Sequence, residues 1–196
     1  MEICVDLETS GLLPKVSWAT CVGLGSESGV QQFSAPAKDF REKPLDAEFS
    51  LLTELTETKH NLSEKDFLIG YNSFKFDLPF LQARLEYHKL STDIVKELRK
   101  AKHIDMSLYC RTLTKTDRTP DGYYITKDES ARKLCALYVP SSASGAYLAQ
   151  IYSNQVVTDE EHLDCLNHNS IDITTELKMH HHFMRIPDYK EFYGLK

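Results

Sequence analysis

The stretch "EICVDLETSGL", Glu2 to Leu12, places two acidic residues at the end of an apolar run that we expect to form a buried strand. Residues two apart on a strand point to the same face, so Asp6 and Glu8 project their carboxylates into one small volume. Two like charges that close together are costly unless a cation binds them. A divalent cation that prefers oxygen ligands, Mg²⁺ or Mn²⁺, is the simplest partner for such a pair.

The pattern Asp-x-Glu is not specific by itself, because the chain contains it twice more, at Asp46/Glu48 and Asp159/Glu161. Both later copies fall where we predict the start of a helix, and acidic residues there favour the positive end of the helix dipole. Only the first copy ends an apolar strand, and a turn or capping role stays open for it on this stretch alone. A metal site therefore requires further carboxylates.

The composition indicates one globular domain over residues 1–196, because 196 residues at 41% hydrophobic content supply one sizeable core. The five cysteines are scattered, with no Cys-x-x-Cys pair, which argues against a disulfide framework or a zinc site and favours a reducing cytoplasm. No apolar run approaches the length of a membrane span, and no signal sequence precedes the first strand. We expect a soluble, cytoplasmic protein that starts at its own Met1.

The apolar periodicity predicts strands followed by an alternation of strands and helices. The predicted strands lie at residues 3–5, 19–24, 30–33 and 67–71 and near residue 104. The predicted helices lie at residues 48–59, 78–90, 94–100, 130–138 and 146–152 and in a long segment that begins at residue 158. A polar stretch at 114–127 resembles a hairpin insertion. This order predicts an α/β fold with a mixed central sheet of about five strands covered by helices.

A second stretch, "GYNSFKFDLPFL" at Gly70 to Leu81, lies where a predicted strand gives way to a helix. Asp77 reads either as an N-cap before Pro79 in the first turn, or as a further carboxylate at the carboxyl end of a strand. Asn72 likewise reads as a turn residue or as part of a cleft. Ligands of such sheets bind at the carboxyl ends of the central strands, which is where Asp6 and Glu8 already lie.

A third stretch, "CLNHNSIDITTEL" at Cys165 to Leu177, lies inside the long helix, where His168 and Asp172 are four residues apart and share a face. The buried side is predicted from the apolar residues on roughly the opposite face. These residues are Leu163, Leu166, Ile173, Leu177 and Met184. The pair is a solvated ion pair, or a catalytic pair if its face meets the cleft.

Taken together and in this order, "VDLETSGL", "GYNSFKFDLPFL" and "HNSID" resemble the three exonuclease motifs of the DEDD superfamily. These proteins are the DnaQ-like 3′-to-5′ exonucleases of the ribonuclease-H-like fold. The second motif is closest to the proofreading exonuclease domain of family B DNA polymerases. No polymerase sequence follows here, so we expect a stand-alone nuclease. The third motif departs from the family, which has Tyr-x3-Asp or His-x4-Asp, whereas this chain has His168-x3-Asp172.

The resemblance implies a site for two divalent ions, Mg²⁺ or Mn²⁺, held by Asp6, Glu8, Asp77 and Asp172, with Asp6 bridging the pair. His168 takes the place of the family's tyrosine. A neutral imidazole, with an ordinary pKa of about 6.5, accepts a proton from an attacking water better than a phenol does. The expected reaction removes nucleoside 5′-monophosphates from the 3′ end of a single strand.

The resemblance also implies that Thr9, Leu12, Asn72 and Phe76 contact the terminal nucleotide. The net charge of -6 argues against bulk capture of a polyanion. Residues 84–118 nevertheless carry nine Lys and Arg against five Asp and Glu, so they either follow the phosphates or form a solvated helix face.

Single-stranded DNA is the expected substrate. RNA trimming is one alternative, because nothing in the motifs reads a 2′-hydroxyl. Nucleic-acid binding without catalysis is another. Tyr123 and Tyr124 are candidates for base stacking. His180, His181 and His182 cannot share one helix face, so we expect an exposed run rather than a metal site. Asp105, which ends its own strand, is expected to be structural.

Overall fold

The central sheet has five strands in the order β3-β2-β1-β4-β5. The first three strands form an antiparallel meander, and β4 and β5 continue the sheet parallel to β1. The strands are β1 (Glu2–Thr9), β2 (Ala19–Ser26), β3 (Gly29–Ser34), β4 (Phe67–Gly70) and β5 (Lys102–Asp105). The computed structural model describes residues 1–58, 62–114, 125–140 and 142–195. The predicted mixed sheet of an α/β fold is confirmed.

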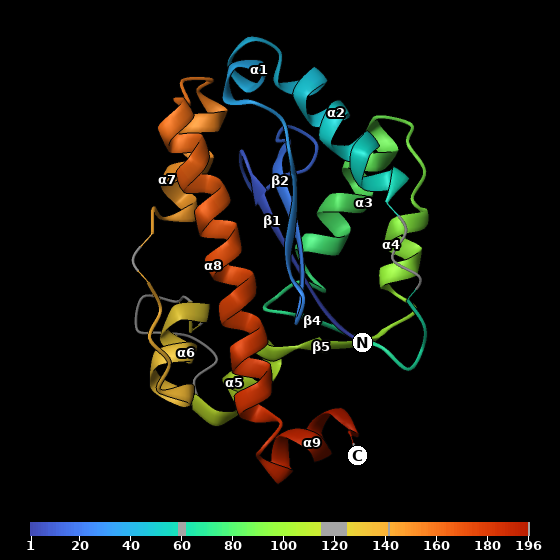
Figure 1. Cartoon of the computed structure of the whole chain (residues 1–196), viewed down its shortest axis with the longest axis vertical. Coiled ribbons are helices and arrows are strands. Elements are labelled where there is room, and N and C mark those ends of the chain that lie inside the picture. The colour runs from blue at the N-terminus through green and yellow to red at the C-terminus, as the bar shows by residue number, and fades with distance from the viewer. Residues whose placement is uncertain (59–61, 115–124, 141, 196) are drawn as a thin grey trace.

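Helices cover both faces of this sheet (Figure 1). They are α1 (Ala37–Glu42), α2 (Pro44–Glu57), α3 (Asp77–Tyr87), α4 (Asp93–Leu98), α5 (Met106–Thr114), α6 (Lys127–Cys135), α7 (Gly145–Ser153), α8 (Asp159–Phe183) and α9 (Pro187–Tyr193). The sequence patterns did not predict α1, α5 and α9, which are short. None of the helices in the described ranges is long and apolar enough to cross a membrane.

Capping boxes determine where two functional helices begin. Helix α8 begins where the sequence predicts it. The Thr158 hydroxyl accepts from the Glu161 amide while the Glu161 carboxylate accepts from the Thr158 amide. Thr126 and Glu129 open α6 in the same way. Most of the predicted hairpin, residues 115–124, lies outside the described residues, but its predicted end at residue 127 is wrong because Lys127 is already helical.

Alternation along β1 divides the core in two. Ile3, Val5 and Leu7 point into an apolar cluster with residues of α2 and α3. Cys4, between them, belongs to a second cluster with residues of α8. Figure 1 shows α8 along one side of the β1–β2 pair and α2 and α3 on the other. Because Asp6 and Glu8 are in phase with Cys4, they also face α8.

The packed face of α8 follows the predicted apolar stripe only in part, because Ile173 and Leu177 are buried as predicted and other members are not. Leu163 is 56% exposed, whereas Asn169, Asp172 and Glu176 are buried beside Ile173. These polar residues can be buried because they have hydrogen-bond and ion-pair partners. The spacing of apolar residues in the sequence does not reveal such partners. The face that carries the predicted catalytic pair therefore points into the protein.

Two glycines in β2 allow α8 to lie this close. A Cβ at Gly23 would stand 2.1 Å from Oδ1 of Asn169, and one at Gly25 would stand 2.1 Å from Cγ2 of Ile173. Both separations are far inside van der Waals contact. The position of α8 therefore requires glycine at both of these positions in β2.

A buried ion pair joins the elements on the other face. The Arg84 guanidinium of α3 donates to both carboxylate oxygens of Glu48 in α2, at 2.9 and 2.6 Å. His88 lies 2.7 Å from the same carboxylate, and the Ala19 amide at the start of β2 donates to it at 2.7 Å. A third Arg84 nitrogen donates to the Pro14 carbonyl in the loop after β1, at 2.8 Å.

This network corrects two interpretations of the sequence. Glu48 is fully buried and serves as an ion-pair partner, whereas Asp46 is the acidic residue in the first turn of α2. Arg84 is 2% exposed and already paired, so it is not part of a phosphate path. Residues 115–118 of the predicted basic stretch lie outside the described residues.

We predict that Glu48→Ala lowers the free energy of unfolding by about 3–5 kcal/mol, because it leaves a buried guanidinium without its partner. Urea denaturation followed by circular dichroism measures the change. Glu54→Ala, at an exposed position on the same helix, is the matched control and should stay within about 0.5 kcal/mol of wild type. Equal losses in the two variants would contradict a structural role for the ion pair.

Candidate active site

Strand β1 and helix α8 meet side chain to side chain, running in opposite directions. Near the start of β1, the Cys4 thiol donates to Oε2 of Glu176 at 3.0 Å. Further along β1, Nδ2 of Asn169 donates to the main-chain carbonyl of Asp6 at 3.0 Å and to its Oδ2 at 2.8 Å. Asn169 is fully buried, so these bonds hold the Asp6 carboxylate in one orientation.

The next level of the same contact brings together His168, Glu8 and Asp172. Nε2 of His168 lies 3.9 Å from Oε1 of Glu8 and 3.6 Å from Oδ2 of Asp172. The three groups each offer one ligand atom, and these atoms all lie within 4.8 Å of one another. On the other side of the ring, Nδ1 lies 2.9 Å from the Ser142 hydroxyl, which orients the imidazole.

Asp77 reaches the same region from α3. The N-cap of α3 is Phe76 with no side-chain capping bond, so the interpretation of Asp77 as an N-cap is wrong. Instead, Oδ1 of Asp77 accepts from the Leu7 amide of β1 at 3.1 Å. Because Leu7 is the residue between Asp6 and Glu8, this bond brings the Asp77 carboxylate to the same part of β1. The structure thus brings together all four acids that the motifs singled out.

Lys127 and Glu176 belong to the same group of charges, although neither was predicted from the sequence. The Lys127 ammonium at the start of α6 contacts the Asp172 carboxylate and lies 3.3 Å from Oε1 of Glu176 and 3.7 Å from Oδ1 of Asp6. Glu176 had a usable signal, because it follows Asp172 by four residues and shares its helix face. Lys127 had none, because it lies far along the chain from every motif.

Burial and mutual repulsion shift the titration of these acids. Burial is the main cause that raises the pKa of Glu8 and Asp77 well above the ordinary value, and the negative charge of Asp6 adds to it. Burial also raises the pKa of Asp172, although the Lys127 ammonium opposes that rise. When ionised, these acids together with Glu176 carry more negative charge than the Lys127 ammonium offsets.

This donor set suits divalent cations that prefer oxygen. Carboxylate oxygens dominate the cluster, with one imidazole at its edge, which fits Mg²⁺ or Mn²⁺ better than a thiol-seeking metal. The excess of negative charge supplies the driving force for binding. Glu8, His168 and Asp172 offer ligand atoms that could hold such an ion, and Asp6 and Asp77 add their charges to the same cluster.

The predicted substrate residues lie around the carboxyl end of β1. Thr9 donates its hydroxyl to the Gly11 carbonyl at 2.8 Å and so shapes the turn that follows the acids. Leu12, in that turn, is 77% exposed. Asn72 has a positive φ of 69°, and Phe76 is half-buried with its ring beside the apolar cluster around α3.

Two further predictions have different outcomes. Asp105 accepts from the Asn72 amide at 2.8 Å and from both the amide and the hydroxyl of Ser107, at 3.1 and 2.7 Å. These bonds give it the structural role expected of it. Tyr123 and Tyr124, the candidates for base stacking, lie outside the described residues.

A family model of the RNase_H superfamily matches residues 3–184. No curated protein matches the chain.

Several solved structures share the fold. A family B DNA polymerase from the hyperthermophilic archaeon Pyrobaculum calidifontis superposes with a TM-score of 0.61 at 13% identity, over 93% of this chain and 24% of the polymerase. E. coli exonuclease I in complex with a dA16 oligonucleotide gives 0.56 at 13% identity, over 97% of this chain and 42% of that protein. Brucella melitensis NrnC bound to pGG gives 0.50 at 16% identity, over 98% and 78%. The chain thus spans less than half of the first two proteins.

The raised pKa of Glu8 gives a pH-dependent prediction. Folding raises this pKa above its unfolded value of about 4.3. Between the unfolded and the folded pKa, the metal-free folded state therefore binds more protons than the unfolded state. The contribution of Glu8 to stability therefore falls as pH rises from about 4 through the raised pKa. We predict that Glu8→Gln raises the free energy of unfolding in EDTA by about 1–2 kcal/mol at neutral pH, and by less at pH 5.

Urea denaturation at the two pH values measures this difference. Glu54→Gln, at an exposed position, is the control and should show no change with pH relative to wild type. A stability difference between Glu8→Gln and wild type that shrinks as pH rises would contradict the electrostatic account.

Proposed function

The chain belongs to the RNase H superfamily, and we propose that residues 1–196 form a single 3′-to-5′ exonuclease domain that hydrolyses the terminal phosphodiester of single-stranded DNA. The products are nucleoside 5′-monophosphates. One observation carries the proposal: Asp6, Glu8, Asp77 and Asp172 come from three distant segments and meet at one end of the β1–α8 contact. Such a concentration of buried acids costs stability, which a role in binding cations explains.

In this proposal Asp6, Glu8, Asp77 and Asp172 would hold two divalent ions, Mg²⁺ or Mn²⁺, and Asp6 would contribute to the binding of both. When bound, the ions act as Lewis acids on the phosphodiester and stabilise the leaving 3′ oxygen. Asn169 holds the Asp6 carboxylate in place, and the Leu7 amide does the same for Asp77. These neutral partners orient the acids without competing for the cations.

His168 is the proposed general base. Nδ1 lies 2.9 Å from the Ser142 hydroxyl, and in the proposed tautomer it carries the proton and donates to that oxygen. The lone pair of Nε2 then faces Glu8 and Asp172. A water between these groups then loses its proton to Nε2 as it attacks the phosphorus. The four-residue step from His168 to Asp172 is consistent with this geometry, because both side chains lie on the same side of α8.

Lys127 is a charge-balancing residue in this scheme. Its ammonium contacts Asp172 and lies close to Asp6, so it neutralises part of the acid cluster before any divalent ion binds. Burial alone would lower its pKa, but the surrounding carboxylates raise it well above the ordinary value. The lysine therefore stays charged throughout the neutral pH range.

The proposed substrate is the 3′ end of a single strand. The turn at Thr9 and the exposed Leu12 receive the terminal nucleotide, and Asn72 and Phe76 line the opposite side. E. coli exonuclease I in complex with dA16 supports a DNA strand, and NrnC bound to pGG supports the binding of a short oligonucleotide by the same fold. All five cysteines are buried and free, in keeping with a reducing cytoplasm.

We predict that Asp6→Asn abolishes cleavage at every concentration of Mg²⁺ or Mn²⁺, because the change removes the charge shared by both ions. The assay uses 5′-labelled single-stranded DNA and RNA, with metal or with EDTA, and follows shortening from the 3′ end. Asp46→Asn, a change of the same kind at a surface position, should cleave like wild type. Binding by the wild-type protein without cleavage in any metal would instead indicate an inactive nucleic-acid-binding module.

We predict that His168→Ala slows single-turnover cleavage by about 10²–10⁴-fold and leaves the affinity for the strand near that of wild type, because the change removes a proton acceptor but no strand contact. His182→Ala, in the same helix, is the matched control. A wild-type rate in His168→Ala would exclude this ring as the base.

A further inference from the structure

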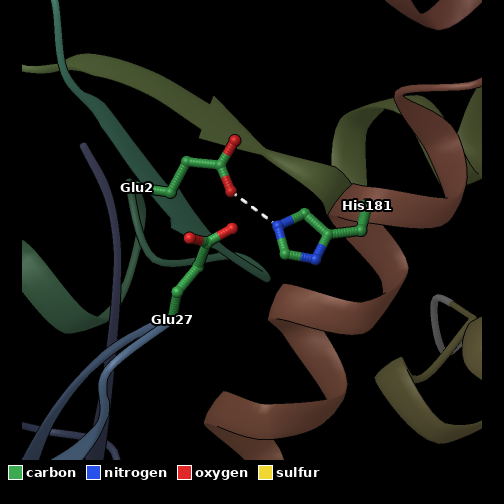
Figure 2. Close-up of side chains that lie close together, drawn as sticks. All are labelled: Glu2, Glu27 and His181. Carbon is green, nitrogen blue, oxygen red and sulfur yellow. Dashed lines mark hydrogen bonds and ion pairs between the residues drawn. The ribbon is translucent and has the colours of Figure 1, made fainter.

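A second group of potential metal ligands lies at the other end of the β1–α8 contact. Glu2 begins β1, Glu27 lies in the turn between β2 and β3, and His181 lies in the last turn of α8. Figure 2 shows the three side chains pointing toward one another. Nε2 of His181 lies 2.7 Å from Oε2 of Glu2, and one ligand atom from each residue lies within 4.8 Å of the others.

The neighbouring His180 provides an independent sign that this group is incomplete. The ring of His180 is fully buried, which contradicts the predicted exposed run. Nδ1 of His180 lies 2.9 Å from the Tyr189 hydroxyl. Nε2 has no hydrogen-bond partner among the described residues, although it lies 3.4 Å from Oε1 of Glu2. A buried nitrogen therefore faces the Glu2 carboxylate without a hydrogen bond to it.

The charge of the group also lacks a counterpart. Neither Glu2 nor Glu27 forms an ion pair with a Lys or Arg in the part of the chain that the structure describes, and the Met1 ammonium pairs with Asp66. Two carboxylates this close together are stabilised by a bound cation.

The geometry is open to an ion from solvent. Glu2 and Glu27 line a surface hollow of about 530 Å³. Ligand atoms around a tetrahedral Zn²⁺ with bonds of about 2.1 Å lie about 3.4 Å apart. Nε2 of His181 and Oε2 of Glu2, at 2.7 Å, are already closer than that, and the upper limit of 4.8 Å exceeds it by about 1.4 Å. The exposed Glu27 side chain can close this gap by a change of rotamer.

We propose that Glu2, Glu27 and His181 bind a Zn²⁺ ion that joins β1, the β2–β3 turn and α8. One imidazole nitrogen with two carboxylates is a donor set that Zn²⁺ accepts, with water in the remaining position. An all-oxygen set would suit Mg²⁺, as in the acid cluster at the other end of α8. On the buried side of this site, Nε2 of His180 faces Oε1 of Glu2 at 3.4 Å. This site is independent of the proposed exonuclease activity.

The test measures Zn²⁺ binding by equilibrium dialysis, on untagged protein carrying Asp6→Asn and Asp172→Asn, so that the acid cluster does not contribute. We expect one Zn²⁺ per chain in this background. Adding Glu27→Gln or His181→Ala should weaken Zn²⁺ binding at least tenfold, whereas His182→Ala, the adjacent histidine, should leave it unchanged. Zn²⁺ should also raise the melting temperature of the background protein and of its His182→Ala form, but not that of the Glu27→Gln form.

Glu27 lies on an exposed turn, so its substitution tests the site without endangering the fold. In Mg²⁺ without Zn²⁺, Glu27→Gln in the otherwise wild-type chain should cleave single-stranded DNA at the wild-type rate, which separates this site from the acid cluster. Equal Zn²⁺ affinity in the background protein and its Glu27→Gln form, or no Zn²⁺ bound in the background protein, would overturn the proposal.

Discussion

The contact between β1 and α8 is the constraint on which the rest of the structure depends. Alternation along β1 sends Asp6 and Glu8 towards the helix, and Asn169 anchors Asp6 from the other side. The contact is possible because β2 has glycines where α8 crosses it. A shift of one residue in the strand would turn both acids into the opposite core, so the position of the acid cluster follows from the strand register.

The buried acids at this contact lower the stability of the fold and supply the groups that the proposed chemistry needs. Acids that would be harmless on the surface are buried beside one another, and the pKa values of Glu8 and Asp77 rise in response. Lys127 offsets part of the repulsion, which is why a residue outside every recognised motif belongs to the site. Buried charge clusters of this kind seldom add net stability, so their presence favours a functional explanation. The Glu48–Arg84 pair differs from this cluster because its two charges are opposite and both carboxylate oxygens accept a hydrogen bond from the guanidinium.

The two ends of the β1–α8 contact differ in chemistry although they share the same two elements. At the carboxyl end of β1 the donors are mainly carboxylates, as in metal sites that hold hard cations. At the amino end, His181 contributes nitrogen beside Glu2 and Glu27, which changes the preferred ion.

The sequence by itself determined the local features: the shared face of Asp6 and Glu8, the start of α8 and the family to which the motifs belong. Each of these depends on spacing or on residues that are neighbours in the chain. Only the tertiary structure decided which side of α8 packs on the sheet, and that Asp77 bonds to β1 instead of capping its helix. Periodicity states which residues share a face, but not what that face meets, because its partners come from segments far along the chain. For the same reason the places of Lys127 among the acids and of His180 in the core had no signal in the sequence.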